Sequence, residues 1–166
     1  AFNGYGKPEA SMGVTVGDAN GDGRLDLFMT HLRDEHNRLY LSTEYAIFGD
    51  ESDSTGLSAV DLPFTGFGCG FFDADNDGDQ DLAVANGRVK RGEILAGANV
   101  GSFWNRYAEP NLLFANDGSG HFSDLSPIAG DFTRQVEVSR GLAFGDIDRD
   151  GDIDLVVGNL GGLRVY

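Results

Sequence analysis

A chain of 166 residues with 40% hydrophobic and 11% aromatic content is long and apolar enough for one folded domain, which excludes a disordered tail. Its net charge of −15 and its 12 scattered basic residues argue against nucleic acid as a partner, because contact with phosphates requires clustered Lys and Arg. There is no apolar run of about 18 residues and Cys69 is the single cysteine, so neither membrane insertion nor an internal disulfide is expected.

The first repeat unit spans approximately residues 11–62 and begins with SMGVTVGD at 11–18. Alternating apolar residues interrupted by glycine are typical of a strand at a crowded position. After an Asp-rich loop come LDLFMTHL at 25–32 and NRLYLST at 37–43, β-rich runs of strand length. The order strand, Asp-rich loop, strand, strand is the pattern that recurs along the chain.

The segment HLRDEH follows the second predicted strand and contains two histidines, His31 and His36. Zinc proteases place two histidines about four residues apart on a helix, whereas these two are five apart and follow a strand. We therefore interpret them as polar surface residues of an interstrand turn.

The second unit spans approximately residues 66–132 and has four predicted strands. These are GFGCGFFD at 66–73, QDLAVANG at 80–87, PNLLFAND at 110–117 and GHFSDLS at 120–126. An Asn-Asp-Gly-Ser-Gly turn joins the last two strands. Cys69 lies in the apolar run of the first strand, at 66–73, and is interpreted as a small buried hydrophobe.

Extra length in the second unit falls at approximately residues 87–109, between its second and third strands, and predicts an inserted surface loop. The loop holds Trp104, the single tryptophan, together with Phe103 and Tyr107. Two interpretations remain open: the aromatic side chains contact a ligand, or they pack against the sheet.

The third unit spans approximately residues 139–166, with predicted strands at 139–146, 153–160 and 163–166. It stops before a fourth strand. Four strands per unit and no long amphipathic helix predict an all-β fold built from β-propeller blades of four antiparallel strands, with about three blades present. We expect a piece of a longer protein or, alternatively, a subunit completed by neighbouring chains.

Each unit contains a nine-residue loop of the form Asp-x-(Asp/Asn)-x-Asp-Gly-x-x-Asp. Calcium takes six to eight oxygen ligands, and a short loop can surround it if oxygen-bearing side chains recur at every second residue around a sharp turn. The candidate side-chain ligands at positions 1, 3, 5 and 9 are Asp18, Asn20, Asp22 and Asp26; Asp73, Asp75, Asp77 and Asp81; and Asp146, Asp148, Asp150 and Asp154. Backbone carbonyls are expected to contribute at position 7, in Arg24, Asp79 and Asp152.

The three loops differ from EF-hands and from simple metal-free turns. An EF-hand would need Glu at position 12, where this chain has Met29, Val84 and Val157. Asp, Asn and Gly also form turns without any metal, but the three loops together hold 13 Asp and two Arg, and such density repels itself without a cation. The sequence therefore predicts three calcium sites, and the first is expected to be weakest because Asn20 replaces a carboxylate.

The segments GDANGDGRLDLFMTHL, YAEPNLLFANDGSGHFSDLS and SRGLAFGDIDRDGDIDLVVGN resemble the FG-GAP and VCBS-type repeats of integrin-α-like β-propellers. The resemblance is closest to the propeller of the cartilage acidic protein (ASPIC/UnbV-associated) family. It implies an extracellular or cell-surface propeller that calcium stabilises and that serves adhesion or recognition, with the calcium ligands at the loop positions named above. Such propellers close with about seven blades.

No nucleophile elbow, phosphate-binding loop or metalloprotease spacing occurs, so we do not expect an enzyme. A protein or a glycan is the expected class of ligand. Two alternatives remain: a structural subunit that assembles through open blade edges into a ring or filament, and a non-catalytic glycan-binding piece of a carbohydrate-active enzyme.

Overall fold

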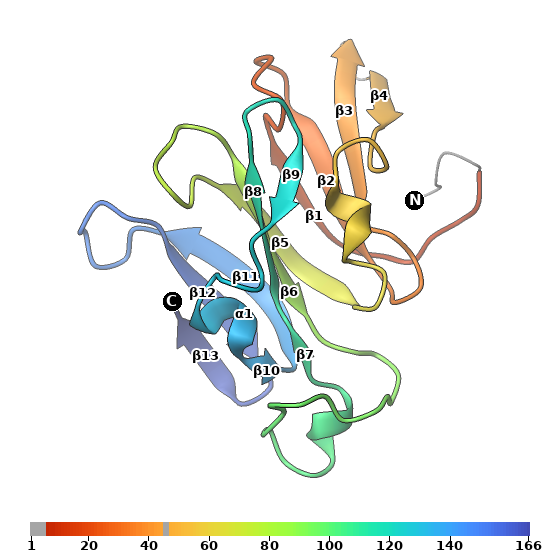
Figure 1. Cartoon of the computed structure of the whole chain (residues 1–166), viewed down its shortest axis with the longest axis vertical. Coiled ribbons are helices and arrows are strands. Elements are labelled where there is room, and N and C mark those ends of the chain that lie inside the picture. Colours follow the sequence, from red (N-terminus) through yellow and green to blue (C-terminus); the bar gives the residue numbers. More distant parts are fainter. Residues whose placement is uncertain (1–5, 45–46) are drawn as a thin grey trace.

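The computed structural model describes residues 6–44 and 47–166, and this part of the chain is built from antiparallel sheets (Figure 1). The first sheet has the order β1-β2-β3-β4. Its strands are β1 (Ser11–Gly17), β2 (Asp26–His31), β3 (Arg38–Glu44) and β4 (Ile47–Asp50). Each strand pairs with the next one along the chain, as in a propeller blade.

The second sheet repeats this meander in the order β5-β6-β8-β9, and the third has the order β11-β12-β13. Their strands are β5 (Gly66–Phe72), β6 (Asp81–Asn86), β8 (Leu112–Asn116) and β9 (Phe122–Asp124), and β11 (Ser139–Gly145), β12 (Asp154–Asn159) and β13 (Gly162–Val165). The predicted all-β class with four-stranded antiparallel blades is confirmed.

Short elements fill the connections. They are η1 (Leu57–Ala59), η2 (Trp104–Arg106), α1 (Asp131–Arg134) and a two-stranded sheet of β7 (Glu109–Pro110) and β10 (Val136–Glu137). No helix in the described ranges is long and apolar enough to cross a membrane.

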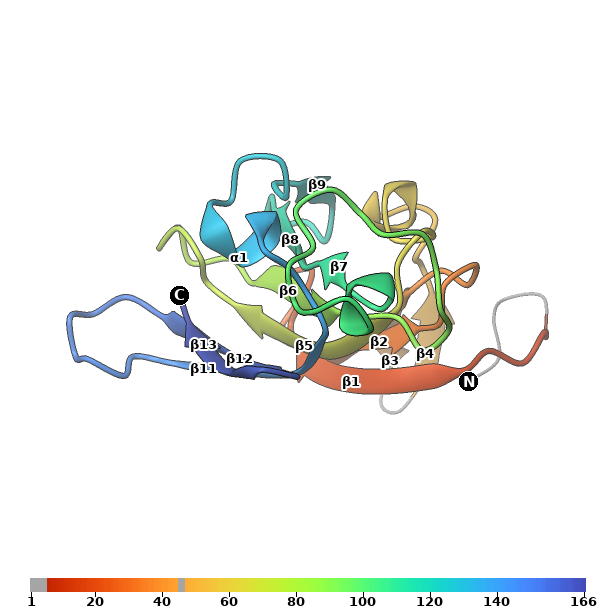
Figure 2. The same cartoon turned by 90° about the horizontal axis from the view of Figure 1, so that it is seen from below.

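The sheets pack face to face, with β5 lying between β1 and β11 (Figures 1 and 2). Glycine makes this approach possible. A Cβ atom on Gly13 would lie 1.9 Å from the carbonyl oxygen of Phe67, and one on Gly68 would lie 2.5 Å from the amide nitrogen of Leu142. The glycines predicted to mark crowded strands therefore lie where one sheet touches the backbone of the next.

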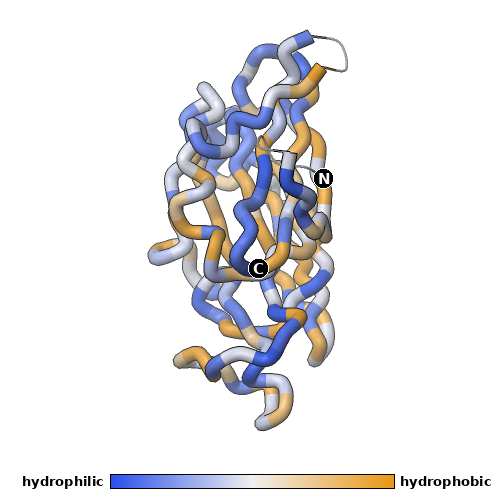
Figure 3. Tube along the Cα trace, turned by 90° about the vertical axis from the view of Figure 1, so that its right-hand side faces the viewer, coloured by the Kyte–Doolittle hydropathy of each residue, from blue (hydrophilic) through white to orange (hydrophobic). Residues whose placement is uncertain are grey.

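Two apolar clusters fill the spaces between the sheets. Phe28 of the first sheet meets Phe71 and Leu82 of the second in one cluster. Ala83 of the second sheet meets Leu155 and Val157 of the third in the other. Successive residues of a strand in the second sheet thus face the first sheet and the third sheet in turn. Hydrophobic and hydrophilic segments alternate at short intervals along the Cα trace (Figure 3).

Cys69 is half-buried against the first cluster, and burial raises the pKa of its thiol to about 12. A thiol with so high a pKa is a poor nucleophile. This agrees with its interpretation as a small hydrophobe.

The expectation that the two histidines lie on the surface was wrong for His31. It pairs with Ser11 in the β1–β2 ladder and is fully buried, with its Nε2 atom 3.2 Å from the Ser11 hydroxyl oxygen. Burial lowers the pKa of His31, although the nearby charge of Glu9 acts in the opposite direction. His36 is half-buried, and its Nδ1 atom lies 2.8 Å from the carboxylate of Asp61.

Candidate metal centres

The three Asp-rich loops connect the first and second strands of each sheet and lie at the same end of the sheets (Figure 1). Position 6 of every loop is a glycine with positive φ, as the turn requires: Gly23, Gly78 and Gly151 have φ of 81°, 96° and 101°. Position 4 is also left-handed, in Gly21, Asn76 and Arg149, with φ of 70°, 61° and 66°. The sequence pattern did not identify this second left-handed position, because it tolerates three different residues.

Backbone amides of the second loop point at its carboxylates. Asp73 accepts hydrogen bonds from the amides of Asp77, at 3.1 Å, and Gly78, at 3.0 Å. The carboxylate of Asp77 in turn accepts one from the Asp79 amide at 2.9 Å. The first loop has the same set, with Asp18 accepting from Asp22 and Gly23. These bonds orient position 1 and curl the loop around its carboxylates.

The third loop shares part of this network. The carboxylate of Asp150 accepts a hydrogen bond from the amide of Asp152 at 3.0 Å, and Asp148 accepts one from the amide of Asp150 at 3.2 Å. Position 7 thus donates its amide to position 5 in all three loops, including Arg24 to Asp22 at 2.9 Å. Ligation by the carbonyls of Arg24, Asp79 and Asp152 stays a prediction.

Position 9 fixes each loop to its sheet. Asp81 is buried, and its two carboxylate oxygens accept hydrogen bonds at 2.8 Å from the amides of Ala74 in the loop and Asn116 in β8. Asp26 does the same with the amides of Ala19 and Ser42. Asp154 accepts a bond from the amide of Ile147 at 2.8 Å. The spacing predicted all three residues as ligands but did not predict that Asp26 and Asp81 also bond to the third strand of their sheets.

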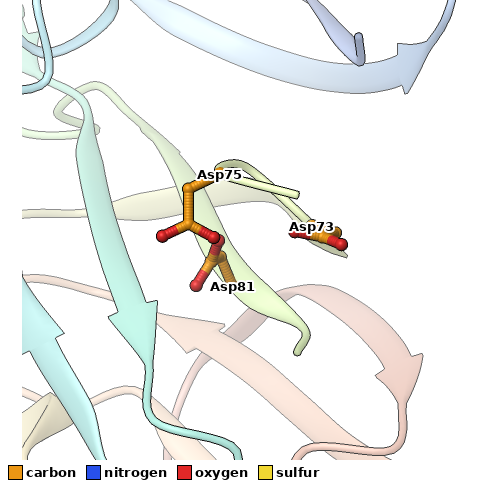
Figure 4. A group of neighbouring side chains, drawn as sticks. All are labelled: Asp73, Asp75 and Asp81. Carbon is orange, nitrogen blue, oxygen red and sulfur yellow. The ribbon is translucent and has the colours of Figure 1, made fainter. Parts of the chain in front are cut away.

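Carboxylates of the second and third loops converge. In the second loop, ligand oxygens of Asp73, Asp75 and Asp81 lie within 4.8 Å of one another (Figure 4). In the third, those of Asp146, Asp148 and Asp154 do the same. Calcium binds oxygen at about 2.3–2.6 Å, so ligands on opposite sides of one ion are up to about 5 Å apart. Positions 1, 3 and 9 therefore fit a single hard cation.

Repulsion between neighbouring carboxylates raises the pKa of two residues in these loops, Asp148 and Asp81. The charge of Asp150 raises the pKa of Asp148. Burial raises the pKa of Asp81, and the charges of Asp75 and Asp77 raise it further. A bound cation would remove this repulsion, since it favours the ionised form of every ligand.

The first loop differs in its charges. Asn20 stands at position 3 and donates a hydrogen bond of 3.1 Å from its Nδ2 atom to the Asp22 carboxylate. The guanidinium group of Arg24 pairs with the same carboxylate and also donates to the carbonyl oxygen of Ser42 at 2.9 Å. The negative charge of Asp22 is thus already partly balanced by a side chain.

The insertion of the second unit lies at the other end of the sheets, because β6 begins at the Asp loop and ends where the insertion begins (Figure 1). An ion pair closes its base: the Nε atom of Arg88 donates to the buried carboxylate of Glu109 at 2.9 Å. Burial raises the pKa of Glu109, and its hydrogen bonds to Thr65 and Arg88 oppose this shift.

Aromatic residues of the insertion pack on one another and stay partly exposed. The ring centroids of Phe103 and Trp104 are 4.8 Å apart, those of Trp104 and Tyr107 are 5.6 Å apart, and the Arg91 guanidinium lies 4.9 Å from the Phe103 centroid. A cavity of about 490 Å³ lies between the insertion and the third sheet. Its lining includes Asn99, Trp104, Glu137, Asn159 and Arg164.

Comparison with known proteins agrees with this architecture. The chain is 40% identical over 79 residues to cartilage acidic protein 1 of Mus musculus and to that of Homo sapiens. It is 37% identical over 71 residues to cartilage acidic protein 1 of Xenopus tropicalis. The match to the mouse and human proteins covers 47% of this chain but only 12% of either relative. The match to the frog protein covers 43% of this chain and 11% of that relative.

A broader match places these sheets in a family. Residues 73–157, about half of the chain, match the FG-GAP-like repeat. This segment begins with the second Asp loop and ends within β12, so it includes both carboxylate clusters. The chain belongs to the FG-GAP-like repeat family.

Proposed function

We propose that this chain is an extracellular, non-catalytic calcium-binding repeat protein that serves adhesion or recognition, and that one calcium ion in each Asp loop braces its sheet. The observation that carries the proposal is the pair of carboxylate clusters, each with three residues within 4.8 Å in the same register of two loops. The likeness to cartilage acidic protein 1 supports the extracellular setting.

The residues at positions 1, 3 and 9 would hold the ion, which supplies positive charge and crosslinks oxygens from separate backbone segments. Asp73 and Asp75 lie in the loop, whereas Asp81 begins β6 and accepts the amide of Asn116 in β8. Ligation of all three joins the loop, the second strand and, through Asp81, the third strand. Calcium is therefore expected to stabilise the folded sheets more than the unfolded chain.

Recognition is assigned to the opposite end of the sheets. There the insertion presents Phe103 and Trp104, which are 50% and 39% exposed, beside a cavity of a size typical of ligand sites. Exposed aromatic rings with Asn and Arg side chains nearby suit a protein or a glycan ligand. Because the Asp loops lie far from this surface, calcium acts through the stability of the sheets and does not bridge to the ligand.

The test is calorimetric titration of the chain with calcium, combined with thermal melting in calcium and in a chelator. We expect saturable binding and a higher melting temperature with calcium. Asp73→Ala and Asp146→Ala should each remove one binding step, because each deletes position 1 of one loop. Asp53→Ala, in an exposed turn outside the loops, is the matched control. The proposal fails if a chelator leaves the melting temperature of the unmodified chain unchanged.

A further inference from the structure

The two outer sheets each have one face packed against the second sheet and one face that nothing in the described part of the chain covers. On the first sheet, Met12, Val14 and Val16 of β1 are 39%, 60% and 51% exposed. On the third, Leu163 and Val165 of β13 are 76% and 60% exposed. Rows of exposed apolar side chains on a sheet mark an interaction surface.

The interior contacts show how such faces fit together. A Cβ atom on Gly17 of β1 would lie 2.7 Å from the Phe71 ring of β5, just as one on Gly13 would meet the Phe67 carbonyl. In the next interface a Cβ atom on Gly70 would lie 2.2 Å from the Phe144 ring. Small residues of one sheet thus receive larger residues of the next. We call these the small-residue face and the large-residue face.

The third sheet presents a small-residue face on which no other sheet of the described chain packs. Gly141, Ala143 and Gly145 hold the positions in β11 that Gly13, Thr15 and Gly17 hold in β1. Among the described residues, no heavy atom lies within 4 Å of a Cβ atom built on Gly141 or Gly145. The same face continues across the sheet, because Ala143 pairs with Val156 and Val156 pairs with Val165.

In the second sheet, the residues equivalent to this face pack against a neighbouring sheet. Ala83 pairs with Leu113 as Val156 pairs with Val165. Ala83 is fully buried against the third sheet, and Leu113 packs on the same cluster. The Val156–Val165 pair is thus equivalent to the Ala83–Leu113 pair, but no described sheet packs against it.

The first sheet presents a large-residue face that no other sheet of the described residues covers. Met12, Val14 and Val16 hold the positions in β1 that Phe67, Cys69 and Phe71 hold in β5, where they contact the preceding sheet. The half-buried side chains of Leu27 and Met29 lie beside them on β2, since Val16 pairs with Leu27 and Val14 with Met29. Every copy of the chain therefore carries one uncovered small-residue face and one uncovered large-residue face. Faces of these two kinds pack together at both interfaces between its own sheets.

We propose that the large-residue face of one copy docks on the small-residue face of a second copy, head to tail, and repeats the packing of β1 on β5 and of β5 on β11. The contact is made by sheet faces and not by the hydrogen-bonding edges of β4 or β13. Such a contact uses two different surfaces, so it leads to a closed ring or an open filament according to the rotation between copies.

Sedimentation of the 166-residue chain in saturating calcium tests this proposal. We expect dimers or larger assemblies that dissociate on dilution. Gly141→Leu should weaken association at least tenfold without unfolding the chain, because its side chain would fill only the docking space. Gly161→Leu is the matched control, since it lies in the β12–β13 turn and also has no heavy atom near its Cβ among the described residues. Circular dichroism confirms that each variant is folded.

A mixing experiment tests the polarity of the contact. Val14→Asp should also give monomers, because it damages the large-residue face. Each variant then keeps one intact face, so a mixture of Gly141→Leu and Val14→Asp chains should form a one-to-one pair although neither associates alone. A persistent monomer of the unmodified chain overturns the proposal and assigns these faces to further sheets of a longer polypeptide. Association that both substitutions leave unchanged overturns it as well.

Discussion

Position 3 is the place where the three loops differ in ligand charge. Asn20 occupies it in the first loop, whereas Asp75 and Asp148 belong to the carboxylate clusters of the other two. Arg24 reduces the negative charge of the first loop further, through its ion pair with Asp22. Both features act in the same direction, so calcium should bind least tightly there.

The first prediction is that Asn20→Asp strengthens the first site. One more unit charge at about 4 Å from the divalent ion contributes about 2 kcal/mol even at the dielectric of water, which is about a thirtyfold tighter dissociation constant. The titration is done in a chain with Asp73→Ala and Asp146→Ala, so that only the first loop binds. Asn99→Asp adds the same charge at the far end of the molecule and should change little. Equal affinities before and after Asn20→Asp would show that charge at position 3 does not set the order of the sites.

At the scale of elements, one side chain joins three segments. The Nδ2 atom of Asn116, at the end of β8, donates to the carbonyl oxygens of Ala19 at 2.8 Å and Gln80 at 2.9 Å. Its Oδ1 atom accepts from the amides of Gly118 and Gly120, both at 3.2 Å. Asn116 therefore links the first Asp loop, the second Asp loop and the β8–β9 turn.

The second prediction is that Asn116→Ala lowers the free energy of unfolding by about 2–3 kcal/mol, because buried carbonyl and amide groups lose their partners. Urea unfolding in saturating calcium measures the loss, with Asn99→Ala, at an exposed site, as the control. A change below about 0.5 kcal/mol would mean that water replaces these bonds at little cost. The calcium affinity of the first loop should fall together with stability, since Ala19 lies inside that loop.

Local sequence patterns predicted the strands and the Asp loops, but they did not predict the contacts between sheets. Alternation and glycine spacing located the strands, and the Asp register identified positions 1, 3 and 9, which converge in the second and third loops. Asn116 looked like an ordinary turn residue, because its partner Ala19 is 97 positions away. His31 looked like a surface residue because nothing local reveals that its ladder pairing with Ser11 buries it. Such roles depend on how separate strands and sheets meet, which no single segment encodes.

For the whole molecule, charge is distributed unevenly. The net charge is −15, and the three loops alone hold 13 Asp against two Arg. All three loops lie at one end of the sheets, and the Asn76 side chain of the second loop donates to Asp152 of the third at 3.0 Å (Figure 1). Neighbouring loops therefore repel one another across short distances, and folding without calcium must overcome this field.

The last prediction follows from that field. In a chelator, raising sodium chloride from about 0.05 M to about 0.5 M should raise the melting temperature by roughly 2–4 °C, the shift that about 1 kcal/mol gives in a chain of this length, because shorter screening lengths weaken repulsion among the loops. In saturating calcium the same change should have much less effect, since bound ions already neutralise the carboxylates. Tetramethylammonium chloride is the control, because it screens charge without coordinating oxygen and should act like sodium chloride. If the melting temperature rose equally with salt in chelator and in saturating calcium, repulsion among the loops would not be the main electrostatic term that destabilises the folded chain. Calcium would then stabilise the chain by crosslinking alone.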